Sequence, residues 1–309
     1  MKNLLIYLTH PHVGVWNLQD RHVEQLSAQF PGFRIVKCLH SKEFLEGISE
    51  ADAAICWYFR REWVGRASRL QWIATPAAGS DWIDLPPESS ITIHHGGFHG
   101  LMMAESVLGA MLYFCKAFEA SRNFQKQKKW ARIKLSQQIS SLYRARVTIL
   151  GFGRIGRTIG RAVKPFGSLV TGVRRRADER PDYFDEADRV VPVDRLDEVL
   201  PETDHLVLVL PGGKETDGLL TADHFARLPA HCHLYNVGRG NPYREEHLVR
   251  ALETRQIAGA YLDVFDEEPL PESSPLWGFD NVLIQPHLSA ASPQYLDLFI
   301  QELIGKIKS

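Results

Sequence analysis

Short apolar runs alternate along this chain with longer stretches whose apolar residues recur at helical spacing. In the first hundred residues, segments of helical length such as 18–29 separate the runs 4–8, 34–38, 53–57, 72–74 and 91–93. Apolar runs of this length are typical of strands that are buried on both faces of a parallel sheet. The alternation therefore predicts an α/β fold with a parallel sheet.

The second half repeats the alternation and predicts a complete doubly wound unit. Its strand-like runs begin at Val147, Leu169 and Val190 and continue at 205–210, 234–237, 258–262 and 282–284. Between the halves, a stretch over 101–128 is apolar until Phe118 and then basic, which predicts one long connecting helix. The last segment, 293–308, also has a helical pattern, and we expect it to pack back on the N-terminal domain.

A glycine pattern follows the first strand of the second half. The strand at 147–150 runs directly into Gly151-Phe152-Gly153-Arg154-Ile155-Gly156, a G-x-G-x-x-G sequence. Such glycines allow a tight turn and a close approach of the backbone to a pyrophosphate, which the N-terminus of the next helix attracts. Alone this pattern is a weak signal, but a strand before it and a helix after it indicate dinucleotide binding.

Three arginines end the second strand of this unit. NAD sites usually place an acidic residue about 20 positions beyond the glycines, where it binds the ribose 2′-hydroxyl. This chain has Arg174, Arg175 and Arg176 there instead. An arginine can bind a 2′-phosphate through charge-assisted hydrogen bonds, so we expect NADP(H) to be favoured over NAD(H), with Arg174 and Arg175 as the preferred contacts. The alternative is a solvated basic turn.

Length and composition narrow the class of protein. The 309 residues suffice for two domains of ordinary size, and a net charge of −1 gives no electrostatic reason to expect nucleic acid or a membrane as partner. No stretch approaches the roughly 18 apolar residues of a membrane span. The four cysteines lie far apart, and the histidines at 94, 95 and 99 lack an ordered carboxylate partner. We therefore expect a cytoplasmic protein that binds a small molecule and no metal.

Three polar residues follow apolar strands of the second half, on the side where α/β sheets bind ligands. Arg239 lies between two glycines, and its guanidinium can hold a carboxylate through two parallel hydrogen bonds. His287 is a natural proton donor near neutral pH, and a carboxylate from Glu268 would favour its charged form and orient its ring. Each residue alone is more often an exposed charge or a structural histidine, but their joint occurrence favours a catalytic set.

Four segments carry a resemblance to a known family. They are GFGRIG at 151–156, NVGRG at 236–240, GAYLDVFDEEPLP at 259–271 and NVLIQPHLSA at 281–290. In residues, order and spacing, these segments resemble the D-isomer-specific 2-hydroxyacid dehydrogenase family, and most of all its glyoxylate and hydroxypyruvate reductase-like members. The resemblance covers essentially the whole chain, including 99–105 at the predicted domain crossing.

The resemblance implies two Rossmann-like domains with a cofactor and substrate cleft between them. Residues 1–98 and 288–309 would form a discontinuous, flavodoxin-like substrate-binding domain, and residues 99–287 the dinucleotide-binding Rossmann domain. The implied activity is hydride transfer from NADPH to a small 2-oxo acid, which gives a D-2-hydroxy acid. A homodimer is implied as well, because the segment around 101–135 commonly forms a dimer arm in this family.

The resemblance also assigns roles to residues at matching positions. Arg239 would bind the carboxylate and polarise the carbonyl, protonated His287 would donate to the carbonyl oxygen, and Glu268 would keep His287 charged. Cofactor contacts are expected at Gly151, Gly153, Arg154, Ile155, Gly156, Arg174, Arg175, Arg176, Pro211, Thr216, Val237 and Asp263. Substrate contacts are expected at Tyr58, Arg60, Ala78 and Gly79 in addition to Arg239.

One segment departs from the family pattern, and two other functions share the fold. Residues 241–246 read NPYREE, where most relatives have a small residue and Val-Asp or Val-Asn before the glutamate, and this predicts a reshaped cleft floor. A formate-type dehydrogenase is disfavoured, because formate enzymes have an amide at the Glu268 position. A dinucleotide-binding corepressor or redox sensor can retain all three catalytic residues, although no extended disordered tail supports that function here.

Overall fold

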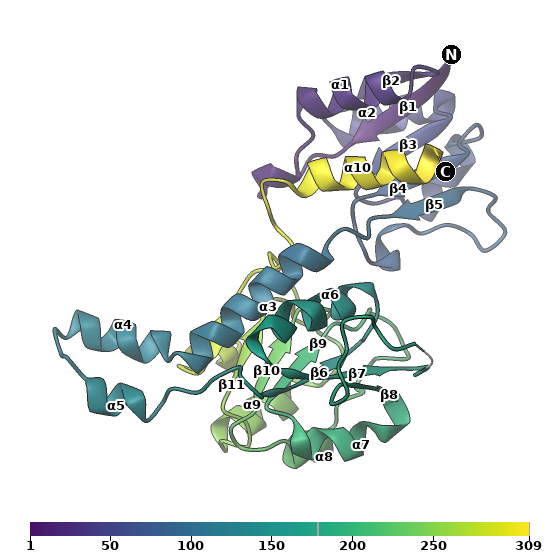
Figure 1. Cartoon of the computed structure of the whole chain (residues 1–309). Helices are drawn as coiled ribbons and strands as arrows, with labels where there is room; N and C mark the ends of the chain where they lie inside the picture. The colour runs from purple at the N-terminus through teal and green to yellow at the C-terminus, as the bar shows by residue number, and fades with distance from the viewer. Residues whose placement is uncertain (178, 309) are drawn as a thin grey trace. The chain divides into compact units, whose positions relative to one another are not determined.

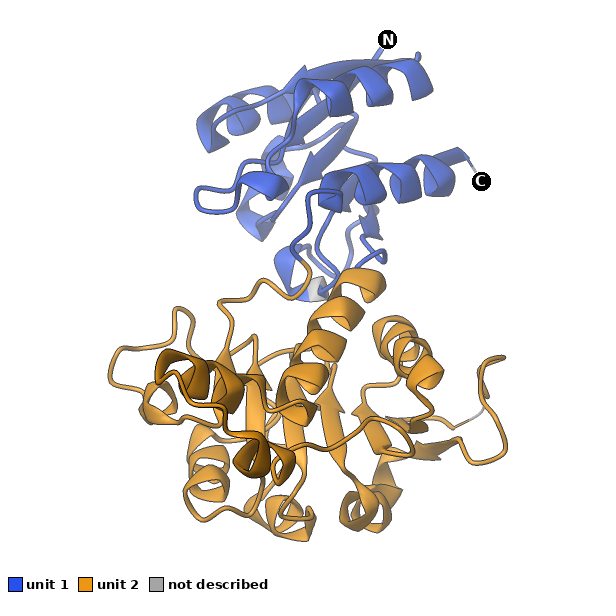
Figure 2. Cartoon of the chain, turned by 60° about the vertical axis from the view of Figure 1, so that its left-hand side comes forward, with its two compact units in different colours: residues 1–99, 291–309 blue, residues 100–290 orange. Residues whose placement is uncertain are grey.

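The computed structural model describes residues 1–177 and 179–308 and contains two compact units (Figure 2). Met1–His99 and Ala291–Ser309 belong to the first unit, and Gly100–Ala290 forms the second. Each unit has one parallel sheet covered by helices. The predicted α/β class with two doubly wound parallel sheets is therefore confirmed.

The first unit is built on a five-stranded sheet of order β2-β1-β3-β4-β5 with parallel pairing. Its strands are β1 (Lys2–Tyr7), β2 (Phe33–Lys37), β3 (Ala53–Cys56), β4 (Trp72–Thr75) and β5 (Thr92–His95), and its α-helices are α1 (Asp20–Gln29), α2 (Ser41–Gly47) and α10 (Tyr295–Lys308). Helix α10 packs beside α1 (Figure 1), where Asp297 pairs with Arg21 at 3.1 Å and with His22 at 3.0 Å. The end of the chain thus completes this unit.

The second unit has a seven-stranded parallel sheet of order β12-β11-β10-β9-β6-β7-β8. Its strands are β6 (Arg146–Leu150), β7 (Leu169–Arg174), β8 (Arg189–Pro192), β9 (His205–Leu208), β10 (His233–Asn236), β11 (Gly259–Leu262) and β12 (Val282–Ile284). Its α-helices are α3 (Gly100–Cys115), α4 (Phe118–Lys126), α5 (Arg132–Ser136), α6 (Arg154–Val163), α7 (Leu196–Val199), α8 (Ala222–Arg227) and α9 (Glu245–Glu253). The strand order reverses between β6 and β9, and such switch points are where α/β sheets bind ligands.

Buried side chains hold helices to both faces of the second sheet. Val147 and Ile149 of β6 pack in one cluster with residues of α3 and α6, whereas Leu150 packs in another with residues of α7, α8 and α9. These two groups of helices lie on opposite faces of the sheet (Figure 1). This alternation follows from the period of two in a strand. Because both faces are apolar, the polar residues that serve a ligand are confined to the strand ends.

The stretch 101–128 forms two helices, so the prediction of one continuous helix is wrong. Helix α3 ends at Cys115, α4 begins at Phe118, and the pair is bent by 59°. Ala117 has a left-handed φ of 49°, and the Ser140 N–H donates to the Cys115 carbonyl at 2.8 Å, which takes the acceptor that a longer helix would need. Within the described residues no single helix is long and apolar enough to cross a bilayer, and this bent pair meets that test by length and composition alone.

Candidate active site

The glycine loop joins β6 to α6 at the switch point of the second sheet. Gly151 has a φ of +98°, and a Cβ on it would lie 2.4 Å from the Val209 carbonyl oxygen, so glycine is required. Gly153 caps α6, and a Cβ there would meet open space. Gly156 lies on the first turn of α6 against the Gly151 carbonyl. The exposed backbone at this helix N-terminus fits the pyrophosphate of a dinucleotide.

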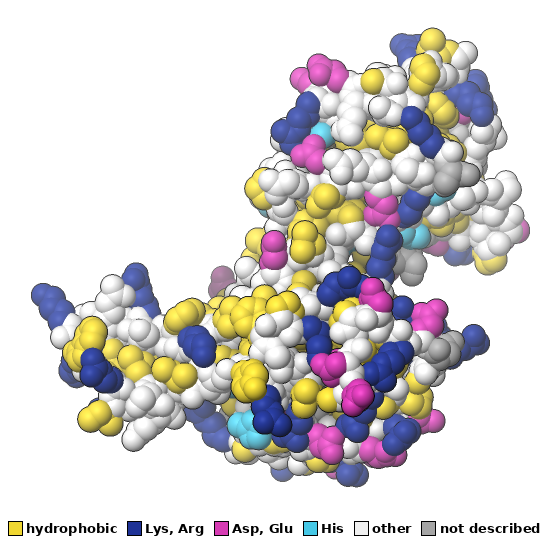
Figure 3. Space-filling view, viewed as in Figure 1, with side chains coloured by type: hydrophobic (Ala, Val, Ile, Leu, Met, Phe, Trp, Pro, Cys, Tyr) yellow, Lys and Arg dark blue, Asp and Glu magenta, His cyan; other side chains and the backbone are white. Residues whose placement is uncertain are grey.

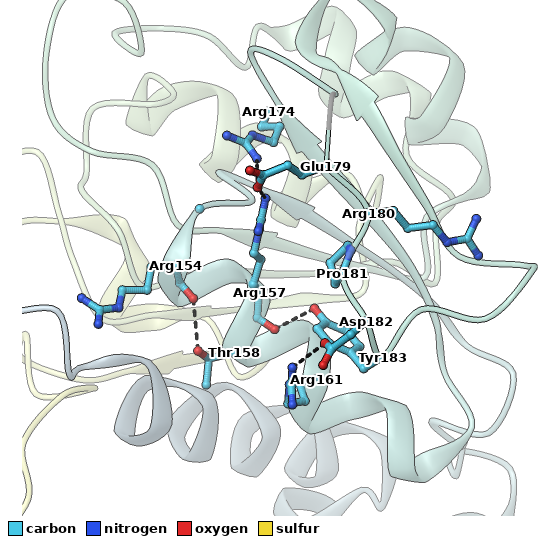
Figure 4. Close-up of a pocket in the computed structure, with 11 residues that line it drawn as sticks. Arg154, Arg157, Thr158, Arg161, Arg174, Glu179, Arg180, Pro181, Asp182 and Tyr183 are labelled. Atoms are coloured by element: carbon cyan, nitrogen blue, oxygen red, sulfur yellow. Dashed lines mark hydrogen bonds and ion pairs between the residues drawn. The ribbon is translucent and has the colours of Figure 1, made fainter.

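A pocket of 860 Å³ lies beside this loop (Figure 4). Its lining comes from the loop, from α6, from the end of β7 and from the segment after β7, and comprises Gly153, Arg154, Arg157, Thr158, Arg161, Arg174, Glu179, Arg180, Pro181, Asp182 and Tyr183. Five of these residues are arginines and two are acids. The excess of positive charge favours an anionic ligand.

The structure separates the three consecutive arginines that the sequence singled out. Arg174 lines the pocket, is 31% exposed, and lies 3.7 Å from the Glu179 carboxylate. Arg175 is 81% exposed and pairs with Glu215 at 2.8 Å, and Arg176 is exposed. Sequence reasoning missed Arg157, which bonds Glu179 at 2.5 Å from the first turn of α6. Its place one residue after the G-x-G-x-x-G pattern was the available signal.

The other predicted cofactor residues lie near the glycine loop or beyond neighbouring strands. Arg154 is exposed and Ile155 half-buried on the first turn of α6. The Thr216 hydroxyl donates to the exposed Pro211 carbonyl at 2.8 Å in the loop after β9, and Val237 is buried just after β10. These positions border the carboxyl edge of the sheet, and their contacts with a cofactor stay predictions.

Arg239, Glu268 and His287 follow β10, β11 and β12, which are three adjacent strands. Parallel pairing therefore brings them to one edge of the sheet. Gly240 permits this packing, because a Cβ on it would lie 2.0 Å from the Phe265 carbonyl carbon. The loops after β10 and β11 are in contact because residue 240 has no side chain.

Segment 241–246, which departs from the family pattern, is linked to the Arg239 loop through the buried side chain of Asn236. Asn236 is fully buried, and its Nδ2 donates to the Arg239 carbonyl at 2.8 Å and to the Tyr243 hydroxyl at 3.1 Å. Tyr243 is buried as well, and burial raises the pKa of its hydroxyl. The structure thus assigns Tyr243 a supporting position beneath the loop.

His287 and Glu268 form a hydrogen-bonded pair. His287 Nδ1 donates to Glu268 Oε2 at 2.8 Å, and the Phe265 N–H donates to Glu268 Oε1 at 3.0 Å. The hydrogen bond to Glu268 raises the pKa of His287, although burial opposes it. Burial alone would raise the pKa of Glu268, but the bonds from His287 and Phe265 outweigh it and lower that pKa. Both shifts favour the imidazolium–carboxylate form of the pair, in which Nε2 can donate to a substrate.

Asp263 fixes the backbone of the His287 loop. His287 has a left-handed φ of 55°, and its N–H donates to the Asp263 carbonyl oxygen at 2.8 Å. The fully buried Asp263 carboxylate accepts from the N–H groups of Leu288 at 2.7 Å and Ser289 at 3.0 Å. Burial raises the pKa of Asp263 even though these donors oppose the rise. Asp263 thus positions His287, and its predicted contact with a cofactor stays a prediction.

The predicted substrate residues lie at the carboxyl edge of the first sheet. Tyr58 and Arg60 follow β3, and Ala78 and Gly79 follow its neighbour β4. The Arg60 guanidinium lies over the Tyr58 ring at 5.7 Å, Ala78 is exposed, and Gly79 is half-buried. These four residues belong to the first unit, whereas Arg239, Glu268 and His287 belong to the second.

Comparison with known proteins gives matches over most of the chain. A family model described as D-isomer specific 2-hydroxyacid dehydrogenase, NAD binding domain, matches residues 108–289. The chain is 29% identical over 302 residues to a glyoxylate/hydroxypyruvate reductase A of Klebsiella pneumoniae (strain 342), with 93% of this chain and 90% of that protein covered.

Solved structures match nearly the whole chain. A D-isomer specific 2-hydroxyacid dehydrogenase family protein from Aeromonas salmonicida subsp. salmonicida A449 matches with a TM-score of 0.83 and 32% identity, over 99% of this chain and 96% of that one. A probable 2-hydroxyacid dehydrogenase from Rhizobium etli CFN 42, in complex with NADP, HEPES and L(+)-tartaric acid, matches with a TM-score of 0.80 and 26% identity, over 99% and 93%.

Fold, glycine loop and family model together define an oxidoreductase of the dinucleotide-binding class. The chain belongs to the D-isomer specific 2-hydroxyacid dehydrogenase family. The resemblance found in the four sequence segments is therefore confirmed.

Proposed function

We propose that this protein reduces a small 2-oxo acid to a D-2-hydroxy acid with NADPH. The observation that carries the proposal is the juxtaposition of Arg239, Glu268 and His287 at one sheet edge, with His287 Nδ1 bonded to Glu268 at 2.8 Å. Glyoxylate and hydroxypyruvate are the first substrates to test, because the Klebsiella relative carries that name. The carboxylate of Glu268 disfavours a formate-type dehydrogenase, because formate enzymes have an amide at that position.

The chemistry follows from where charge develops. Arg239 binds the substrate carboxylate and draws electron density from the adjacent carbonyl. As a hydride reaches the carbonyl carbon, the oxygen gains negative charge, and His287 donates a proton to it from Nε2. The nicotinamide, when bound, supplies the hydride. We place Tyr58, Arg60, Ala78 and Gly79 on the substrate side, where backbone N–H groups of the last two would hold the carboxylate.

The direct test is NADPH consumption with a panel of 2-oxo acids. Loss of NADPH absorbance is expected on adding glyoxylate, hydroxypyruvate, pyruvate or phenylpyruvate, with one of them clearly preferred. Folded protein that oxidises neither NADPH nor NADH with any member of a broad panel would overturn the proposal. Dinucleotide binding without turnover would instead favour the corepressor or redox-sensor function.

The pH profile tests the role of Glu268. Reduction needs protonated His287, so its kcat/KM is expected to fall as pH rises through the raised pKa of that residue. Glu268→Gln removes the carboxylate that raises this pKa, and the alkaline limb should move to lower pH. Oxidation needs neutral His287, so its profile should move in the same direction. The exposed neighbour Glu267→Gln is the control, and an equal shift in both variants would contradict the assignment.

The NADPH preference rests on the basic pocket beside the glycine loop and is supported by the NADP complex of the Rhizobium structure. Replacing Arg174 by Asp and Arg175 by Ser should lower the ratio of kcat/KM with NADPH to kcat/KM with NADH by about 10- to 100-fold. The reason is that a charge-assisted hydrogen bond contributes about 1.5–3 kcal/mol. Single variants should show the larger effect at Arg174. The exposed Arg250→Ser on α9 is the control, and an unchanged ratio in the double variant would refute the basic-site argument.

We also propose a homodimer, and this proposal is supported by helices α4 and α5 and the residues around them. Trp130 is 87% exposed, and Phe118, Ile133 and Ile139 are exposed too. Hydrophobic side chains gather here beside lysines and arginines (Figure 3). Several large apolar side chains exposed close together are typical of an interaction surface.

The expected cytoplasmic location stays a prediction.

A further inference from the structure

Glu179 lies between two arginines in the pocket beside the glycine loop (Figure 4). Its Oε2 is 2.5 Å from Nη2 of Arg157 and 3.7 Å from Nη1 of Arg174. Arg157 belongs to the first turn of α6, and Arg174 is the last residue of β7. Two cations from separate elements therefore converge on one internal anion.

The partners in this cluster differ in exposure. The Arg157 and Arg174 side chains are each 31% exposed, whereas that of Glu179 is 64% exposed. Both arginines are thus more buried than the carboxylate that pairs with them. An exposed carboxylate contributes little to stability through such ion pairs. A phosphate monoester carries nearly twice the charge of a carboxylate and has three acceptor oxygens, so it can bind both guanidinium groups at once.

The chain beyond Glu179 is attached to α6 by other contacts. The Tyr183 hydroxyl donates to the Arg157 carbonyl at 2.7 Å, and Asp182 pairs with Arg161 at 2.6 Å. Gly160 allows this approach, because a Cβ there would lie 2.7 Å from the Tyr183 oxygen. The Glu179 carboxylate can therefore leave the arginines while this attachment stays in place.

We propose that Glu179 competes internally with the 2′-phosphate of NADPH for Arg157 and Arg174. In the cofactor-free protein the carboxylate neutralises the two arginines, and the 2′-phosphate displaces it and takes both. The inference rests on the proposed use of NADPH. Under this proposal Arg157 is a second residue that binds the 2′-phosphate, and Glu179 weakens the binding of NADPH. NADH has no 2′-phosphate and leaves the Glu179 pair intact.

Equilibrium binding tests the proposal without turnover. Glu179→Gln should lower the Kd for NADPH about three- to tenfold, since it removes both the competing ion pairs and a repelling charge, while the Kd for NADH stays the same. Arg157→Gln should raise the Kd for NADPH about 10- to 100-fold and leave that for NADH unchanged. Glu202→Gln removes the same charge from the exposed pair with Arg189 and should leave both constants unchanged. Circular dichroism of each variant establishes that it is folded.

Three outcomes would overturn the proposal, and they are distinguishable. Equal Kd values for NADPH in Glu179→Gln and Glu202→Gln would show that Glu179 does not compete. Weaker NADH binding by Glu179→Gln would make Glu179 an acceptor for the ribose 2′-hydroxyl instead. Calorimetry with 2′,5′-ADP and 5′-AMP tests the foundation, because equal affinity of the wild-type protein for both would remove the NADPH preference itself.

Discussion

Replacing Arg239 with alanine is expected to lower kcat/KM for 2-oxo acid reduction by about 10³-fold. The guanidinium is proposed to hold the carboxylate and to stabilise the charge that develops on the carbonyl oxygen, and loss of one such donor in an oxyanion site costs about 10²–10³-fold before the lost binding is counted. Arg239→Lys keeps the charge but not the planar fork, so it should recover part of the loss. Steady-state kinetics with saturating NADPH measures both variants.

The control for this experiment is another arginine between β10 and α9. Arg244 is exposed where α9 begins, and Arg244→Ala should retain wild-type kinetics. The Arg239 variants should bind NADPH as the wild type does, because their defect concerns the acid substrate. Near-normal kcat/KM for Arg239→Ala would defeat the assignment.

Replacing His287 with asparagine is expected to lower kcat for reduction by about 10²–10⁴-fold, because a general acid contributes that much to proton transfer. Asparagine suits this position, since the backbone there has a left-handed φ of 55°, which asparagine tolerates better than alanine does. The loss should appear in kcat with little change in KM, whereas Arg239→Ala should raise KM as well. Single-turnover kinetics isolates the chemical step.

An exposed histidine provides the comparison for His287. His40→Asn in the first unit should leave kcat unchanged. The melting temperature of His287→Asn should stay close to that of the wild type. Wild-type turnover by a folded His287→Asn protein would exclude this residue as the proton donor.

Much of the fold and of the candidate catalytic set could be predicted from local sequence. Apolar runs such as 147–150 predict buried parallel strands, because few other structures bury every residue of so short a segment. Arg239 and His287 were identifiable because each comes shortly after such a run. Parallel pairing then brings strand ends together without further information.

Features that depend on distant parts of the chain were not predictable. The break after Cys115 depends on Ser140, which supplies the N–H that ends the helix. Arg174 and Arg175 look equivalent in sequence, but consecutive residues at a strand end point to opposite sides, and the register decides which of them lines the pocket. Glu179 reaches Arg157 only because of the path of the chain after β7.

The buried Asp263 carboxylate protects two backbone amide protons from exchange with solvent, and both lie directly after His287 in the sequence. The N–H groups of Leu288 and Ser289 exchange with solvent only when their hydrogen bonds to the Asp263 carboxylate break, and the neighbouring His287 N–H is bonded to the Asp263 carbonyl oxygen. Hydrogen exchange at these two positions would therefore report how often the loop that carries His287, the proposed proton donor, opens. It would do so in the absence of substrate and cofactor, and at any pH where the protein is folded.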